Sequence, residues 1–225
     1  MSIWDNILKN VLTIDVLWYV PAILISMTLH EVSHGFAAYK LGDTTAKSQG
    51  RLSLNPIKHI DIMGLIMLIV AKFGWAKPVQ VDVRNFKDPK KDMALCAAAG
   101  PISNFILAFF SMIVIYTLSN FENAVTYYVS TFFIYFMSVN ISLGIFNLIP
   151  IPPLDGSKVF AALLPDGAYI RYMRFERYGF MALMLLLYFG TLSNFLMRLR
   201  ELVWQGLYIA VSVPIDAIVA LFTGG

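Results

Sequence analysis

The sequence predicts an all-α polytopic membrane protein with five to six transmembrane helices plus a short re-entrant or membrane-associated element. Hydrophobic residues make up 58% of the 225 residues and charged residues only 14%, whereas soluble domains have roughly 45–50% and about 25%. Several apolar stretches are long enough to cross a bilayer, which takes about 20 helical residues. The Lys and Arg residues gather between some of these stretches. This composition argues against a disordered chain, a disulfide scaffold and a nucleic-acid-binding domain.

The expected spans follow one another within a single domain that covers residues 1–225. They lie at about 11–39, 93–119, 126–149, 178–197 and 203–222. A further apolar stretch at 60–73 is too short to cross and is typical of a re-entrant element, which we expect over about 60–80. The residues leave open whether this element forms strands, a hairpin or a short helix.

The basic residues predict the orientation of the chain. Most of the 17 Lys and Arg residues lie in 40–58, 72–91 and 158–177, and cytoplasmic loops carry an excess of such residues. The 60–73 stretch has basic residues on both sides, which favours re-entry over a full crossing. Five crossings then place the N-terminus outside and the C-terminus in the cytoplasm, with Arg198 and Arg200 on the side that the rule disfavours.

The first span contains the motif His30-Glu31-Val32-Ser33-His34. Positions i and i+4 share a helix face, so both imidazoles can reach one metal ion. Glu31 lies beside that metal, where it can take a proton from a water molecule. Ionisable groups inside a membrane are costly and persist mainly where they function. Such ligands are typical of catalytic zinc, so we expect one Zn²⁺ per chain.

A catalytic zinc site needs a third protein ligand, and Asp155 is the best candidate. The prolines at 150, 152 and 153 break the preceding helix, and irregular backbone at membrane depth is tolerated where it lines a cavity. The predicted topology places Asp155 and His30 at similar depth, toward the cytoplasmic side. Two alternatives remain: Asp155 caps the following helix, or His59 is the third ligand.

Together these motifs resemble the site-2 protease family of intramembrane zinc metalloproteases, in its compact form without a PDZ domain. The matching segments are 30–34, 74–79, 99–104 and 147–156. The resemblance implies that His30, His34 and Asp155 bind zinc and that Glu31 is the general acid/base. It also implies that Asn104 lies near the active site and holds substrate or polarises the scissile carbonyl. From the residues alone, Asn104 is equally a common kind of interhelical hydrogen bonder.

The expected activity is regulated intramembrane proteolysis, in which peptide bonds in or next to transmembrane segments are hydrolysed. The expected location is a cell membrane, crossed several times, with the active site toward the cytoplasm. The partners are a membrane-protein substrate and the lipid bilayer, with no nucleic acid, and the oligomeric state is unknown. We expect an unwound substrate strand to pair with the edge of the element at 62–80. The alternative is a transporter, whose sites also use broken helices, or a metal-binding scaffold without proteolysis.

Overall fold

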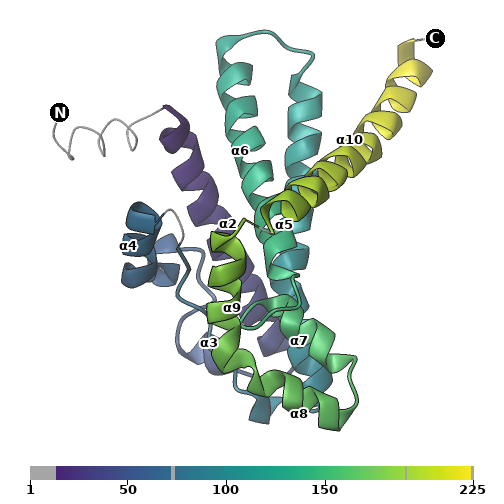
Figure 1. Cartoon of the computed structure of the whole chain (residues 1–225). Coiled ribbons are helices and arrows are strands. Elements are labelled where there is room, and N and C mark those ends of the chain that lie inside the picture. Colours follow the sequence, from purple (N-terminus) through teal and green to yellow (C-terminus); the bar gives the residue numbers. More distant parts are fainter. Residues whose placement is uncertain (1–13, 72–73, 191, 224–225) are drawn as a thin grey trace, which may run out of the picture.

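The computed structural model describes residues 14–71, 74–190 and 192–223, and helices account for nearly all of its regular structure (Figure 1). The elements are α2 (Ile14–Lys40), α3 (Thr45–Ser48), η1 (Pro56–His59), α4 (Ile62–Ala71), η2 (Val83–Asn85), α5 (Pro89–Leu118), α6 (Ala124–Asn147), α7 (Asp155–Ala162), α8 (Asp166–Arg174), α9 (Glu176–Tyr188) and α10 (Ser193–Thr223). The described ranges contain no β-strand, which confirms the predicted all-α class. Positions 11–13, 72–73 and 191 of the expected membrane segments lie outside the described residues.

Four of the described helices are long and apolar enough to cross a membrane, namely α2, α5, α6 and α10. The local sequence explains where two of them begin. Asp88 precedes α5 and its side chain accepts a hydrogen bond from the Lys91 N–H at 3.2 Å, and α6 begins with a reciprocal capping box between Asn123 and Thr126. The chain is therefore a multi-pass membrane protein.

The helices α5 and α6 lie side by side as an antiparallel pair, and α2 lies next to them (Figure 1). The largest buried cluster joins α5 and α6 to α10 and contains Ala108, Met112, Met137, Ile141 and Val211. A second cluster joins α2 to α6. These contacts hold the helices that carry the candidate site in fixed positions.

The helices α9 and α10 differ from the two spans expected at 178–197 and 203–222. Gly190 has a φ of 68°, a left-handed conformation that favours glycine, directly after α9 ends. The 13 residues of α9 span only about 20 Å, less than the hydrocarbon core of about 30 Å. In contrast, α10 begins at Ser193 and continues through Arg198 and Arg200. The charges of Arg198 and Arg200 led us to expect a loop here, although Leu, Met, Arg and Glu are good helix formers.

The direction of α10 follows from contacts at its two ends. Near its start, Leu196 packs against a cluster that Leu183 of α9 forms with Ile149 and Leu154, which lie just beyond the end of α6. Near its other end, the Tyr116 hydroxyl donates to Asp216 Oδ1 at 2.5 Å, close to where α5 ends. The end of α10 thus lies toward the same end of the bundle as the α5–α6 turn (Figure 1), whereas five crossings would place it with the basic loops. The start of α10 lies near the far end of α9 from α8, in the middle of the molecule (Figure 1).

The apolar stretch at 60–73 contains the short helix α4, whose ten residues span about 15 Å. The backbone on either side of it comes together: Ile60 forms an antiparallel bridge with Ala76, and the Lys77 N–H donates to the His59 carbonyl at 2.9 Å. Chain entry and exit are therefore adjacent, as a re-entrant element requires. The question that the sequence left open is answered by a short helix followed by an extended segment.

Candidate metal centre

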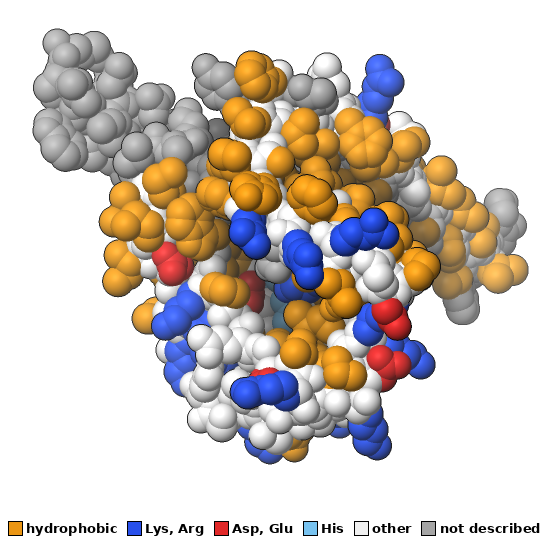
Figure 2. Space-filling view, turned by 60° about the horizontal axis from the view of Figure 1, so that its bottom comes forward, with side chains coloured by type: hydrophobic (Ala, Val, Ile, Leu, Met, Phe, Trp, Pro, Cys, Tyr) orange, Lys and Arg blue, Asp and Glu red, His pale blue; other side chains and the backbone are white. Residues whose placement is uncertain are grey.

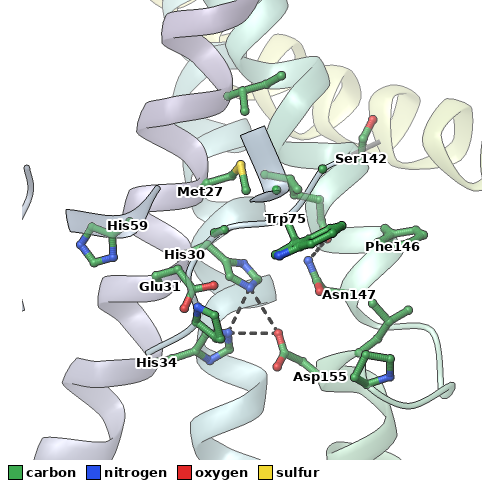
Figure 3. A pocket seen from close by; sticks show the side chains of 18 of the residues that line it. Met27, His30, Glu31, His34, His59, Trp75, Ser142, Phe146, Asn147 and Asp155 are labelled. Atoms are coloured by element: carbon green, nitrogen blue, oxygen red, sulfur yellow. Dashed lines mark hydrogen bonds and ion pairs between the residues drawn. The ribbon is translucent and has the colours of Figure 1, made fainter. Parts of the chain in front are cut away.

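The candidate metal centre is formed by side chains from two helices that are far apart in the sequence. His30 and His34 lie one turn apart on α2, and Asp155 is the first residue of α7. Their ligand atoms converge (Figure 3): Asp155 Oδ2 lies 3.2 Å from His30 Nε2 and 3.0 Å from His34 Nε2, and the two Nε2 atoms are 3.0 Å apart. Both imidazoles are buried. The three ligands that were predicted from the segments 30–34 and 147–156 therefore lie together in the structure.

The spacing of these three atoms suits a zinc ion. Zinc bound tetrahedrally at about 2.0–2.2 Å holds its ligand atoms roughly 3.3–3.6 Å apart, close to the observed separations. The described residues contain this one group of three or more potential ligands with such convergence. The donor set of two imidazoles and one carboxylate leaves a fourth position open, as in catalytic rather than structural zinc sites.

Hydrogen bonds to the outer nitrogen atoms orient both imidazoles. His30 Nδ1 lies 2.6 Å from Asn104 Oδ1, and His34 Nδ1 lies 2.8 Å from the Cys96 carbonyl. Because both partners are acceptors, each Nδ1 carries the proton and donates it. Each Nε2 lone pair then faces the centre, which is the arrangement that metal-ligating histidines usually show.

The Asn104 amide belongs to a buried polar chain across three helices. Its Nδ2 donates to Asn140 Oδ1 at 2.7 Å, and Asn140 Nδ2 donates to Ser26 Oγ at 2.8 Å. All three side chains are fully buried. Since both ends of the Asn104 amide are engaged within the protein, this packing suits a residue that holds His30.

Gly100 on α5 makes the close approach of the two imidazoles possible. A Cβ atom at this position would lie 2.4 Å from His34 Nε2 and 2.6 Å from His30 Cε1. Real Cβ atoms essentially never approach other atoms this closely, so any side chain here would displace the histidines. Gly100 therefore has a direct structural role at the centre, in addition to allowing helix packing.

Glu31 faces the same region from α2, next to the two histidines (Figure 3). Its Oε2 accepts a hydrogen bond of 2.9 Å from the Val79 N–H, in the extended segment that follows α4. No hydrogen bond among the described residues engages its other oxygen. One carboxylate oxygen is thus held while the other remains available.

A cavity of about 990 Å³ opens beside these residues, and most of its walls come from α2, the 74–81 segment, α5, α6, α9 and α10. Figure 2 shows the molecule hollowed on this face, with a histidine on the floor of the hollow and Lys and Arg side chains around it. Asn147 and Lys158 also line the cavity. Lys158 Nζ lies 4.0 Å from Asp155 Oδ1, the oxygen that faces away from the histidines.

Neither alternative for the third ligand agrees with this geometry. His59 lies outside the converging group among the described residues, and its Nε2 donates to the Ser53 carbonyl at 2.8 Å. The N-cap of α7 is Leu154, and no side chain caps this helix. The Asp155 carboxylate therefore faces the histidines instead of the helix N-terminus.

Some residues around the centre were not identified from the sequence. The motif at 147–156 contained Asn147, but nothing marked it as a cavity residue. Asn140 could have been noticed as a polar residue in an apolar span, and Lys158 as a residue three positions after Asp155 on a helix. The matching segment at 99–104 contained Gly100, but nothing in it indicated that this glycine contacts the histidines.

Comparisons with known proteins agree with this centre. The model of peptidase family M50 matches residues 18–190. A protein of Bacillus subtilis that is named as a zinc metalloprotease, YwhC, is 42% identical over 173 residues, which cover 75% of this chain and 79% of YwhC. Rip2 of Mycolicibacterium smegmatis, also named as a zinc metalloprotease, is 28% identical over 180 residues, or 78% of this chain and 68% of Rip2.

A third relative comes from an archaeon. MJ0611 of Methanocaldococcus jannaschii, named in the same way, is 29% identical over 155 residues, which cover 65% of this chain and 74% of that protein. No solved structure matches the chain significantly. The family match spans both helices that supply the converging ligands. The chain therefore belongs to peptidase family M50, the site-2 protease family, and is a zinc metalloprotease embedded in a membrane.

Proposed function

We propose that this metalloprotease hydrolyses peptide bonds in or next to the transmembrane segments of membrane proteins. The location of the ligand set carries the proposal. His30 and His34 lie within a helix that is long and apolar enough to cross a membrane, and all four such helices contribute residues to the walls of the cavity beside them. The apolar residues that these helices contribute suit a membrane-spanning segment as the substrate.

The residues of the chain have separate tasks in this reaction. His30, His34 and Asp155 hold zinc, which when bound polarises a carbonyl and lowers the pKa of a water molecule toward about 7. Glu31 accepts the proton of the attacking water and then returns it to the leaving amine. The open oxygen of Glu31 is the one suited to this transfer, because Val79 already occupies the other.

We assign Asn104 to the support of His30 in place of the substrate contact that the family resemblance implies. Its side chain is fully buried, and its amide bonds to His30 and to Asn140. A substrate could reach it only by breaking this buried chain of hydrogen bonds, which would leave polar groups unsatisfied at a cost of about 1–3 kcal/mol each.

A substrate helix must unwind before attack because its carbonyls are hydrogen-bonded within the helix. The extended segment 74–81, which lines the cavity, is suited to receive the unwound strand by edge pairing. The helical part of the element, α4, has no free backbone edge. The pairing that we expected over 62–80 is therefore proposed only for the extended part.

The active site is proposed to face the cytoplasm. Two of the basic clusters surround α4, and the third covers α7 and α8 at the end of the bundle where α6 terminates. Because all three flank the centre, the positive-inside rule assigns this end of the molecule to the cytoplasmic side.

The deciding experiment compares purified wild type with Glu31→Gln on a panel of membrane-spanning peptides, alongside metal analysis. We expect the variant to retain zinc and to lose cleavage, because the ligands are intact and the proton acceptor is gone. Glu122→Gln, an exposed residue in the α5–α6 turn, is the matched control and should cleave like wild type.

Three results would contradict the proposal in different ways. Continued cleavage by the Glu31→Gln variant would remove Glu31 from its role. A zinc-loaded wild type that cleaves soluble peptides but none of the membrane-spanning ones would refute intramembrane action. Zinc binding with no cleavage of any peptide would support a metal-binding scaffold.

A further inference from the structure

Arg51 is a buried arginine that the proposed reaction does not use. Its side chain donates to three backbone carbonyls: Nη1 to that of Lys58, and Nη2 to those of Lys77 at 2.5 Å and Pro78 at 3.3 Å. The residue is only 8% exposed, and no described carboxylate forms an ion pair with it. Burial of a cation without an acidic partner is costly, so its carbonyl contacts need an explanation.

The position of Arg51 is fixed by the end of α3. The Arg51 N–H donates to the Ala46 carbonyl at 2.9 Å, and the Gly50 N–H donates to that of Lys47 at 3.0 Å. This pair of bonds is the Schellman arrangement, which closes a helix C-terminus. The guanidinium therefore extends from a rigid turn.

The carbonyls that Arg51 contacts belong to the two chain segments on either side of α4. Lys58 precedes that helix, and Lys77 and Pro78 follow it. These segments are also paired by the Ile60–Ala76 bridge and by the bond from the Lys77 N–H to His59. Because the planar fork of an arginine donates to several acceptors at once, Arg51 adds a side-chain cross-link to this backbone pairing.

The second segment connects Arg51 directly to Glu31. The Pro78 carbonyl and the Val79 N–H belong to the same peptide group, which is planar and rigid. Arg51 binds the oxygen side of this group, and the nitrogen side donates to Glu31 Oε2 at 2.9 Å. The segment also rests on α2, because a Cβ at Gly35 would lie 3.2 Å from Val79 Cγ1.

We propose that Arg51 is a positioning residue for the general base, and that it acts through the 78–79 peptide group. It holds this group at the angle at which the Val79 N–H engages one oxygen of Glu31 and leaves the other oxygen to the water. Hydrogen bonds in such a chain also polarise one another. The inference rests on the role proposed above for Glu31.

The kinetic test uses Arg51→Lys and Arg51→Met in the full-length protein with a membrane-spanning peptide substrate. We expect kcat to fall by roughly 10- to 100-fold, the usual cost of a misplaced catalytic group, with zinc content unchanged and KM altered far less. Arg84→Met is the matched control, because Arg84 is exposed and pairs only locally with Asp82. A folded, zinc-loaded Arg51→Met protein with wild-type kcat would overturn the proposal.

The route through Val79 is tested by a double-mutant cycle. Val79→Pro removes the N–H that donates to Glu31, whereas Val79→Ala keeps the N–H and controls for the lost side chain. If Arg51 acts through this group, Arg51→Lys adds little further loss to the Val79→Pro protein. If the fold-losses in kcat of the two single variants multiply in the double variant, Arg51 acts by another route.

A measurement without catalysis separates this inference from the proposed function. Amide hydrogen exchange over 76–81 should speed up in the Arg51→Lys protein and remain unchanged in the Arg84→Met protein, because the Arg51 bonds hold that segment closed. Unchanged exchange would refute the positioning role. A wild type that cleaves nothing would refute the proposed function alone, since the exchange result does not depend on turnover.

Discussion

Single residues around the histidines determine whether the centre can form at all. Asn104 and the Cys96 carbonyl set the ring orientation of the two imidazoles, and Gly100 leaves the space that the rings occupy. None of these groups bears a charge. They act by shape and by hydrogen bonding, so their effect should appear in metal affinity before it appears in the chemical step.

We expect Asn104→Ala to weaken zinc binding by roughly 10- to 100-fold, the usual effect of removing a partner of a metal-ligating histidine. The loss of the acceptor for His30 Nδ1 leaves that ring free to rotate. Competition with a chelator of known affinity measures the change. Asn123→Ala, at the exposed cap of α6, serves as the control.

A different result would return Asn104 to the role that the family resemblance implies. If it held substrate, the variant would bind zinc like wild type and would show a raised KM. The two assignments therefore predict changes in different measured quantities.

The sequence was sufficient to predict His30, His34 and Asp155 as a possible ligand group, which the structure brings together, but insufficient for the residues that support them. Helical spacing brings His30, Glu31 and His34 together within one turn, and the proline-rich break marks Asp155. In contrast, Arg51 and Gly100 act on groups that are distant in sequence, and only packing brings them together. A local pattern carries no information about such contacts.

Among the elements, the junction between the end of α2 and the segment at 82–85 depends on one buried carboxylate. Asp43 is fully buried and accepts hydrogen bonds from the Thr45 hydroxyl and N–H, the Asn85 amide and the Asp82 N–H. Burial alone would raise the pKa of Asp43, but these four bonds outweigh it and lower the pKa below its ordinary value of 3.8.

This junction should make stability dependent on pH. Because the folded pKa lies below the unfolded one, Asp43 stabilises the fold at neutral pH, and this contribution is lost as the pH falls through the folded value. We expect Asp43→Asn to lower the free energy of unfolding by about 1–3 kcal/mol at pH 7, and the difference from wild type to shrink on acidification. Thermal unfolding in detergent at several pH values measures both.

The control for this prediction is Asp166→Asn. That carboxylate is exposed and pairs with Lys90, and such surface pairs contribute little. A constant gap between wild type and Asp43→Asn down to pH 3 would show that the Asp43 carboxylate itself is not the source of the stability.

The elements also show where a hydropathy pattern is ambiguous. Apolar runs correctly indicated α2, α5 and α6, and the shortness of the 60–73 run indicated an element that does not cross. The boundary between α9 and α10 differs from the predicted one at 198–202 because α9 ends at the left-handed backbone of Gly190. The charged residues at 198–201 lie within the continuous helix α10.

For the whole molecule, the direction of α10 gives the chain four long membrane helices and places both the start of α2 and the end of α10 opposite the metal centre. We therefore expect a tag attached after residue 225 to be accessible from outside intact cells. A cysteine at Glu122 should react with an impermeant maleimide from the same side. A cysteine at Gln49, in the basic loop, should react only after the membrane is opened.

Two other labelling patterns are informative. A protected tag with an accessible Glu122→Cys would favour the five crossings that the composition first indicated. Reversal of all three positions would place the active site on the outer side and contradict the cytoplasmic assignment.

The contact between Gly100 and the two imidazoles has a consequence for the classification of other sequences. A chain can carry the full H-E-x-x-H motif and still lack the volume in which its rings must sit. Where the facing helix bears a larger side chain at the matching position, we expect an inactive relative that binds no zinc, whatever its motif suggests. The presence or absence of one methyl group at this position then distinguishes a non-catalytic homologue from an enzyme.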